Sequence, residues 1–202
     1  MQTLNHLQES PSQTAGPYVH IGCVPNFAGI GGVYPNDLGA TMIRDGALGE
    51  PITVTGTIFD GTGTPLKDAL VEIWQADANG IYPGNDPRGP GDPNFTGWGR
   101  KAGDYDTGVW TFETIRPGAV PFPDGRMMAP HISFWIVARG INTGLQSRMY
   151  FPGDPLLDKD PWLTRIEHQN RVATLIAQEK TPGTYQFDIH LQGPDETIFF
   201  DV

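Results

Sequence analysis

The chain has 202 residues, carries a formal net charge of −10 and contains 26 glycines and 19 prolines. An acidic chain of this kind repels nucleic acid and anionic membrane surfaces, so neither is expected as a partner. The glycine and proline content disfavours a helical bundle, and the length suits a single domain with one core.

Cys23 is the only cysteine, so the chain has neither an internal disulfide nor a thiolate metal cage. This cysteine usage is typical of a reducing compartment. The N-terminal residues lack the basic start and apolar core of a signal peptide, and no apolar run is long enough to span a bilayer. We therefore predict a cytoplasmic protein.

The first quarter of the chain is predicted to have little regular structure. Residues 1–18 are polar and have no apolar period, which indicates an extended arm that is ordered only where it lies on another surface. Residues 23–50 hold several glycines and are predicted to be loop. Strand patterns begin only at Ile52.

The middle of the chain alternates between strand patterns and loops. Residues 52–59 and 69–75 are β-prone and flank the turn D-G-T-G-T-P, so a hairpin is expected there. Residues 76–107 are too rich in proline and glycine for a helix or a central strand, and a loop of that length indicates a functional role. Another strand is expected at 108–115, followed by the loop R-P-G-A-V-P-F-P.

The C-terminal part combines the only helical pattern with two more strand patterns. Asp160 followed by Pro161 is typical of a helix start, and the broken apolar stripe beyond it predicts short helices. Residues 184–192 and 196–202 alternate and are predicted to be strands. Taken with the earlier strands, the pattern predicts a mainly β fold, an antiparallel β-sandwich with long irregular loops and short helices.

The strand that starts at His131 carries the most informative chemistry. Alternation places Ile132, Phe134, Ile136 and Ala138 on its core side. The opposite side carries His131, Ser133, Trp135, Val137 and, at the far end, Arg139. An imidazole, a hydroxyl and a guanidinium on one face are more polar than packing requires, which indicates the wall of a site. Residues 145–151 are expected to pair beside this strand.

Several segments resemble, in matching order, the intradiol ring-cleaving dioxygenases. They include P-S-Q-T-A-G-P-Y, L-V-E-I-W-Q-A-D-A-N-G-I-Y, D-P-N-F-T-G-W-G-R, A-P-H-I-S-F and R-M-Y-F-P-G-D-P-L. The likeness covers nearly the whole chain from Pro11 to Val202. It implies a β-sandwich, a catechol substrate and a non-haem ferric iron in the assembly.

In catalytic members of that family, two tyrosines and two histidines hold Fe(III), a hard cation that favours phenolate oxygens. The resemblance puts these positions at Tyr82, Val120, His131 and Ser133. Valine has no lone pair, and a serine hydroxyl is a poor substitute for an imidazole. We therefore assign this chain no metal and no catalytic residue, and expect the Fe(III) in a homologous β-type partner chain that keeps all four ligands.

The resemblance also implies substrate-binding residues in this chain. Arg139 matches an arginine that faces the substrate carboxylate, a group that a guanidinium recognises well. The segment that lines the same pocket corresponds to Thr14, Gly16 and Pro17, with Tyr18 and His20 as neighbours. The chain is thus expected to divide into an arm, residues 1–22, that contacts the partner and a β-sandwich domain, residues 23–202. The whole would be a higher-order α/β oligomer acting on a small catechol and O2.

Two other functions stay open at this point. One is a transthyretin-like β-sandwich binding module without an enzymatic role, although the long loops at 80–100 and 116–131 speak against it. The other is an independent enzyme that uses different iron ligands, for which the sequence offers only the scattered His20 and His190.

Overall fold

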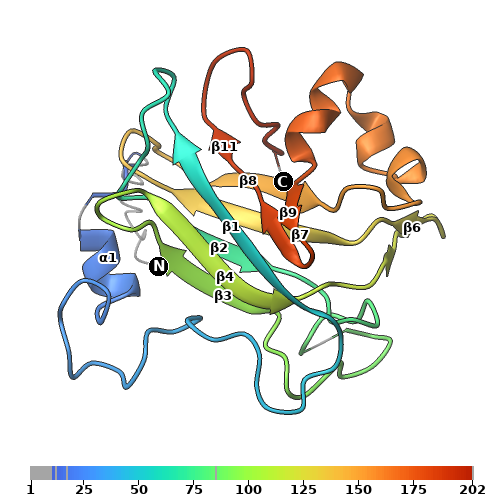
Figure 1. Cartoon of the computed structure of the whole chain (residues 1–202), viewed down its shortest axis with the longest axis horizontal. Helices are drawn as coiled ribbons and strands as arrows, with labels where there is room; N and C mark the ends of the chain where they lie inside the picture. Colours follow the sequence, from blue (N-terminus) through green and yellow to red (C-terminus); the bar gives the residue numbers. More distant parts are fainter. Residues whose placement is uncertain (1–10, 12, 17, 85, 202) are drawn as a thin grey trace, which may run out of the picture.

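Figure 1 shows the computed structural model, which describes residues 11, 13–16, 18–84 and 86–201. Two β-sheets form the body of the molecule, with helical turns near one end and the N-terminal segment at the other. The predicted mainly β fold is confirmed. The expected arm falls largely outside the described residues, which include only Pro11 and residues 13–16 before the first helix.

The first sheet has the strand order β11-β1-β10-β9, with β4 also paired to β1. Its strands are β1 (Pro51–Phe59), β4 (Val109–Ile115), β9 (Gln178–Thr181), β10 (Thr184–Gln186) and β11 (Ile189–His190). β1 pairs antiparallel with β4 but parallel with β10 and β11. This sheet is therefore mixed, because β10 and β11 return beside β1 after a long excursion and not through a hairpin.

The second sheet has the order β3-β2-β7-β8 and is antiparallel throughout. Its strands are β2 (Leu70–Trp74), β3 (Trp98–Ala102), β7 (His131–Val137) and β8 (Leu145–Tyr150). A two-stranded ribbon of β5 (Val120–Pro121) and β6 (Met127–Met128) precedes β7. The predicted pairing of residues 145–151 beside the His131 strand is confirmed.

Apolar side chains from both sheets meet in one core. The predicted inner face of β7 is confirmed, since Ile132, Phe134 and Ile136 are fully buried in the same cluster as Trp110 and Phe112 of β4. Burying each such side chain stabilises the fold by about 1.5–3 kcal/mol. The alternation that defines this core also fixes which side chains of β7 face away from it.

The predicted hairpin between residues 52–59 and 69–75 is wrong. The turn after β1 folds back onto β1 itself, with the Leu66 amide donating to the Ile58 carbonyl at 2.8 Å. The chain then crosses to the other sheet, where β2 pairs with β3 and β7. The alternation of apolar and polar residues fixes which face of a strand is buried but not which strand lies beside it. β1 and β2 therefore show the same alternation although they lie in different sheets.

Two other strand predictions also need correction. The expected loop at residues 76–107 contains β3, an edge strand whose polar sequence W-G-R-K-A hides its pattern. Gly99 in β3 packs so closely that an added Cβ would lie 2.6 Å from the Met42 sulfur. The strand expected at residues 196–202 is wrong, because its described residues make only an isolated bridge between Phe200 and Gln146.

The short helices predicted after Asp160 are confirmed as single-turn or two-turn 3-10 segments. They are η2 (Leu163–Arg165) and η3 (Gln169–Leu175), and a further 3-10 turn that was not predicted, η1 (Leu157–Lys159), lies just before Asp160. Helix α1 (Tyr18–Cys23) was not expected from the sequence, and it crosses the boundary drawn between the arm and the domain. No helix in the described part of the chain is long and apolar enough to cross a bilayer.

Candidate functional site

The four positions that the resemblance assigns to iron ligands lie together near the start of β7. The phenol oxygen of Tyr82 lies 3.5 Å from Nε2 of His131. The other ring nitrogen, Nδ1, is 2.8 Å from the carbonyl oxygen of Ala129 and must donate to it. Nε2 is then an acceptor, so the tyrosine hydroxyl donates to the imidazole.

Val120 and Ser133 complete this group without offering equivalent donors. Val120 is buried in an apolar cluster with Ala76 and Met128, against which Tyr82 packs. The ring of Tyr82 also stacks on Trp74 at 6.0 Å, and Trp74 is the direct β2 neighbour of Ser133 on β7. The structure therefore brings all four sequence-predicted positions together.

The electrostatics of this cluster favour uncharged side chains. Burial raises the pKa of Tyr82 above its ordinary value. Burial, followed by the positive charge of Arg148, lowers the pKa of His131 to about 4. Both side chains are therefore neutral near pH 7. Burial likewise raises the pKa of Tyr150, whose ring lies 5.7 Å from that of His131.

Arg148 is the residue of this region that sequence reasoning missed. It is the direct β8 neighbour of Ser133, and its guanidinium lies 4.5 Å above the ring of Trp162. One of its nitrogens also approaches the sulfur of Met128 at 3.7 Å. Its place in R-M-Y-F, on a strand already predicted to pair with β7, was the signal that could have located it.

Ferric iron does not fit these residues. The four positions supply only one phenol and one imidazole as donors of the family type, and the phenol is held neutral. Val120 offers only an isopropyl group, which has no lone pair, and the Arg148 guanidinium adds positive charge close to His131, where a trivalent cation would bind. Among the described residues, no group of three His, Cys, Asp or Glu side chains lies close enough to hold a metal ion.

The buried cluster is held in shape by Asp160. Its carboxylate, fully buried, accepts hydrogen bonds from the backbone amides of Ala129, Trp162 and Leu163 at 2.8, 2.8 and 3.0 Å. Ala129 in turn holds the His131 ring. The sequence indicated Asp160 as a helix start, but not that it ties the 3-10 segments to the loop before β7.

The other sequence-predicted residues lie at the opposite end of β7. Arg139 stands in the turn after the strand, its side chain 75% exposed, with Nε 2.9 Å from a carboxylate oxygen of Asp68. The Thr14 hydroxyl accepts from the Gly140 amide at 2.7 Å and is within 3.4 Å of the Ala138 carbonyl oxygen. The structure thus joins Thr14 to the Arg139 turn, with Gly16 two residues further along the arm. Pro17 lies outside the described residues.

Two hollows flank this end of the strand. One, of about 510 Å³, is bordered by Arg139, Asn142 and Gln192. The other, of about 420 Å³, is bordered by Thr14 and Gly16 on one side and Trp135 on the other. The predicted pocket residues therefore stand beside open space at the surface and not in a closed cavity.

The two ends of β7 do not form one site. Arg139 lies eight positions after His131, which corresponds to at most about 26 Å at ~3.3 Å per extended residue. The polar face indicated by the sequence as one wall therefore divides into a buried group at His131 and an exposed group at Arg139. In this chain the two groups cannot contact the same small molecule.

The remaining histidine candidates do not assemble into an alternative metal site. His20 is buried in α1, with its ring 6.2 Å from Phe27 and 6.1 Å from Tyr105. His190, on β11, stacks on Phe59 at 5.1 Å. Each is packed against aromatic rings in a different part of the fold.

A family model and the relatives with similar sequences all point to dioxygenases. A family model described as Dioxygenase matches residues 25–193. The protocatechuate 3,4-dioxygenase alpha chain of Pseudomonas putida is 42% identical over 199 residues, which covers 96% of this chain and 97% of that relative. The beta chain of the same enzyme from Burkholderia cepacia is 37% identical over 177 residues, covering 82% of this chain and 75% of the relative.

The fold has solved counterparts as well. The dioxygenase domain of a dioxygenase–carbohydrate-binding protein fusion from Streptomyces sp. SirexAA-E superposes with a TM-score of 0.57 at 24% identity. The match covers 94% of this chain and 100% of that one. At this identity the likeness concerns the fold.

Proposed function

Because the chain belongs to the family of intradiol ring-cleaving dioxygenases, we propose that it is the noncatalytic alpha-type subunit of a heteromeric protocatechuate 3,4-dioxygenase. The assembly would cleave 3,4-dihydroxybenzoate with O2 to 3-carboxy-cis,cis-muconate, in the cytoplasm. The redox chemistry would belong to Fe(III) in a homologous beta-type chain. This chain would help to form the substrate pocket.

The observation that carries the proposal is that the four positions lie together while only two of them keep a donor of the family type. Tyr82 and His131 still lie 3.5 Å apart, yet Val120 and Ser133 complete the group. Such a cluster keeps the architecture of a family site while offering too few ligands for the metal. A chain of this kind supports catalysis only beside a partner that retains the full set.

The exposed end of β7 supports the role in the pocket. Arg139 presents a guanidinium to solvent, since its side chain is 75% exposed and Asp68 is its one carboxylate partner among the residues that the structure describes. A guanidinium recognises a carboxylate through two parallel hydrogen bonds. Thr14 fixes the arm against the same turn, so that Gly16 and Pro17 would reach the partner's pocket together with Arg139.

The same proposal divides the chain into an arm and a domain. Residues 1–22 would contact the partner chain, and residues 23–202 would form the β-sandwich. Helix α1 supports a junction close to this point, because its inner side packs on the sheet while the residues before it reach the Arg139 turn.

Metal analysis of the separated chains tests the proposal. The complex, purified from its native source, should contain about one iron per αβ pair, all of it in the partner chain. This chain alone should be colourless and inactive, and activity should return on recombination. Stoichiometric iron in this chain would contradict the proposal, and a chain that copurifies with no iron-bearing homologue would favour a binding module.

A further inference from the structure

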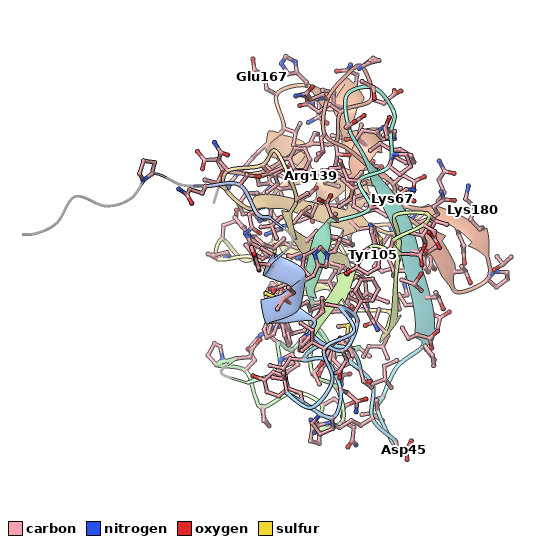
Figure 2. All side chains as sticks on the ribbon, turned by 90° about the vertical axis from the view of Figure 1, so that its left-hand side faces the viewer. Asp45, Lys67, Tyr105, Arg139, Glu167 and Lys180 are labelled. Carbon is pink, nitrogen blue, oxygen red and sulfur yellow. The ribbon has the colours of Figure 1, made fainter. Side chains whose placement is uncertain are left out.

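Stacked arginine and aromatic side chains concentrate at one end of the molecule. We define the arginine–aromatic cluster by the rings of Phe122, Trp162 and Phe200 and the guanidinium groups of Arg126, Arg148 and Arg165. Figure 1 shows the 3-10 segments that carry part of it at the end away from α1, and Figure 2 labels the neighbouring Glu167 at the upper edge, above Tyr105. Because Trp162 packs against the Val120 group, the cluster lies at the His131 end of β7.

Two guanidinium groups of this cluster lack a carboxylate partner. Arg126 is paired with Asp124 at 2.7 Å, whereas Arg148 and Arg165 form no ion pair with any residue that the structure describes. The chain has 23 acidic against 13 basic side chains, so carboxylates are plentiful elsewhere. A guanidinium that is stacked on a ring but not paired keeps N–H donors for an external anion.

A hollow of about 360 Å³ opens beside the cluster. Its wall is formed by Trp162, Ile166, Ile198 and Phe200, and its rim carries Arg165 and Arg171. The volume lies in the range of ~300–1,000 Å³ that is typical of small-molecule sites, which combine apolar walls with a few polar groups. The wall is therefore suited to a flat ring and the rim to an acidic group.

The charges around the hollow favour a ligand with a single negative charge. The guanidinium of Arg148 lies 4.5 Å from the ring of Trp162, within the ~8 Å over which charges act at physiological salt. Arg171 keeps donors although one of its nitrogens is 3.2 Å from the carboxylate of Glu196. Three guanidinium groups, with that of Arg165, thus stand against two carboxylates, with that of Glu167. One positive charge is left over.

We propose that this hollow binds a planar aromatic monocarboxylate, of which benzoate is the simplest. The ring of the ligand would pack against Trp162 and Phe200, since aromatic pairs attract beyond the area that they bury. Its carboxylate would accept hydrogen bonds from Arg165 and Arg171, which a neutral ligand could not match. The inference does not depend on the proposed function, because it uses none of the residues assigned there to the catechol pocket.

Fluorine NMR of the full-length chain, labelled with 5-fluorotryptophan, tests the site directly. The variant Trp162→Phe identifies the resonance of Trp162 among those of the five tryptophans. Titration with benzoate should shift this resonance and give the Kd. The resonance of Trp135, which borders the 420 Å³ hollow beside Thr14, should stay in place. A shift of Trp135 alone, or of neither, would overturn the site.

Benzamide and two arginine variants test the recognition of charge. Benzamide, which has the same shape but no charge, should bind about 10- to 100-fold more weakly than benzoate. Arg165→Gln should raise the Kd of benzoate by a similar factor and leave that of benzamide within about threefold.

Arg44→Gln is the matched control, since Arg44 is also exposed and forms no ion pair in the described chain. It removes the same charge elsewhere and should leave both Kd values within about threefold. Equal Kd values for benzoate and benzamide, or a Kd for benzoate that Arg165→Gln does not change, would overturn the proposal.

Discussion

The two ends of β7 have opposite characters. At the His131 end, Tyr82 and His131 are neutral and lie within hydrogen-bond distance of each other, beside an apolar cluster that contains Val120. At the Arg139 end, a charged side chain is 75% exposed beside an arm that reaches across from the start of the chain. The comparison shows that the two ends of one strand can differ in this way because the first end packs against the Val120 cluster while the second leads into an exposed turn.

The His131 end should be the more sensitive to structural change, and Asp160 should show the largest effect. Asp160→Ala leaves three buried amides, of Ala129, Trp162 and Leu163, without an acceptor. At about 1–3 kcal/mol for each of the three unsatisfied groups, the free energy of unfolding should fall by about 3–9 kcal/mol. Urea denaturation of the complex and of the separate chain measures the change.

Asp160→Asn is the control for that change. The amide keeps one carbonyl oxygen of similar shape, so the loss should be clearly smaller than in Asp160→Ala. Equal stability of the alanine variant and the unmodified chain would mean that the buried end is not held by this carboxylate.

The second largest effect should be a pH dependence that belongs to His131. Its pKa is lowered from 6.5 to about 4 in the folded chain, so the unfolded state takes up a proton first as the pH falls. This stabilisation is present above pH ~6.5 and is lost between ~6.5 and ~4, amounting to about 3 kcal/mol at 1.36 kcal/mol for each pKa unit. Unfolding free energies at pH 7, 5.5 and 4.5 would reveal it.

His131→Asn should flatten this profile, because it removes the titrating ring and can still donate to the Ala129 carbonyl. The carboxylates whose pKa is lowered, such as Asp86 and Asp124, titrate below this window and are common to both proteins. A slope that is identical in the variant would show that the pKa of His131 is not lowered in the folded chain, against the account of the buried end given above.

At the Arg139 end, the change Arg139→Ala should weaken substrate binding and leave the stability of the fold largely unchanged. Loss of a charge-assisted hydrogen bond, about 1.5–3 kcal/mol, predicts that Arg139→Ala raises KM for protocatechuate about 10- to 100-fold. The carboxylate is remote from the reacting carbons, so kcat should change less. Steady-state kinetics of the reconstituted complex measures both constants.

Catechol, which has no carboxylate, provides the control for Arg139→Ala. Its KM should hardly change, and the preference for protocatechuate should shrink by the same factor. Equal losses on both substrates would make Arg139 an interface residue, and unchanged kinetics would leave it as the surface partner of Asp68.

The smallest effect should come from Asp68→Asn. An ion pair as exposed as Arg139–Asp68 contributes about 0.2–1 kcal/mol, so the melting temperature should move only slightly. KM for protocatechuate should stay within about threefold, since Arg139 remains in place. A KM that rises as much as in Arg139→Ala would show that Asp68 orients the guanidinium, which would sharpen the difference between the two ends.

The sequence by itself determined the mainly β fold and the buried face of β7, and the family resemblance indicated Tyr82, Val120, His131 and Ser133, four positions that lie together in the structure. Period-two alternation decides which side chains of a strand face the core. A valine side chain has no atom that can bind a metal, whatever the fold. These conclusions depend on chemistry that each residue carries with it. The wrong prediction of a hairpin between β1 and β2 does not affect these conclusions, because it concerned only which strands pair with each other.

Tertiary structure alone decided which strands lie together and which polar residues meet. β2 does not pair with β1 but lies in the other sheet, between β3 and β7. The edge strand β3 has a polar sequence and is recognised as a strand only by its pairing with β2. The register of β7 and β8 places Arg148 beside Ser133, close to His131. The hydrogen bond from Thr14 to Ala138, beside Arg139, joins residues 124 positions apart. The physical reason is that register and long-range hydrogen bonds depend on how two distant segments pack, which neither segment specifies alone.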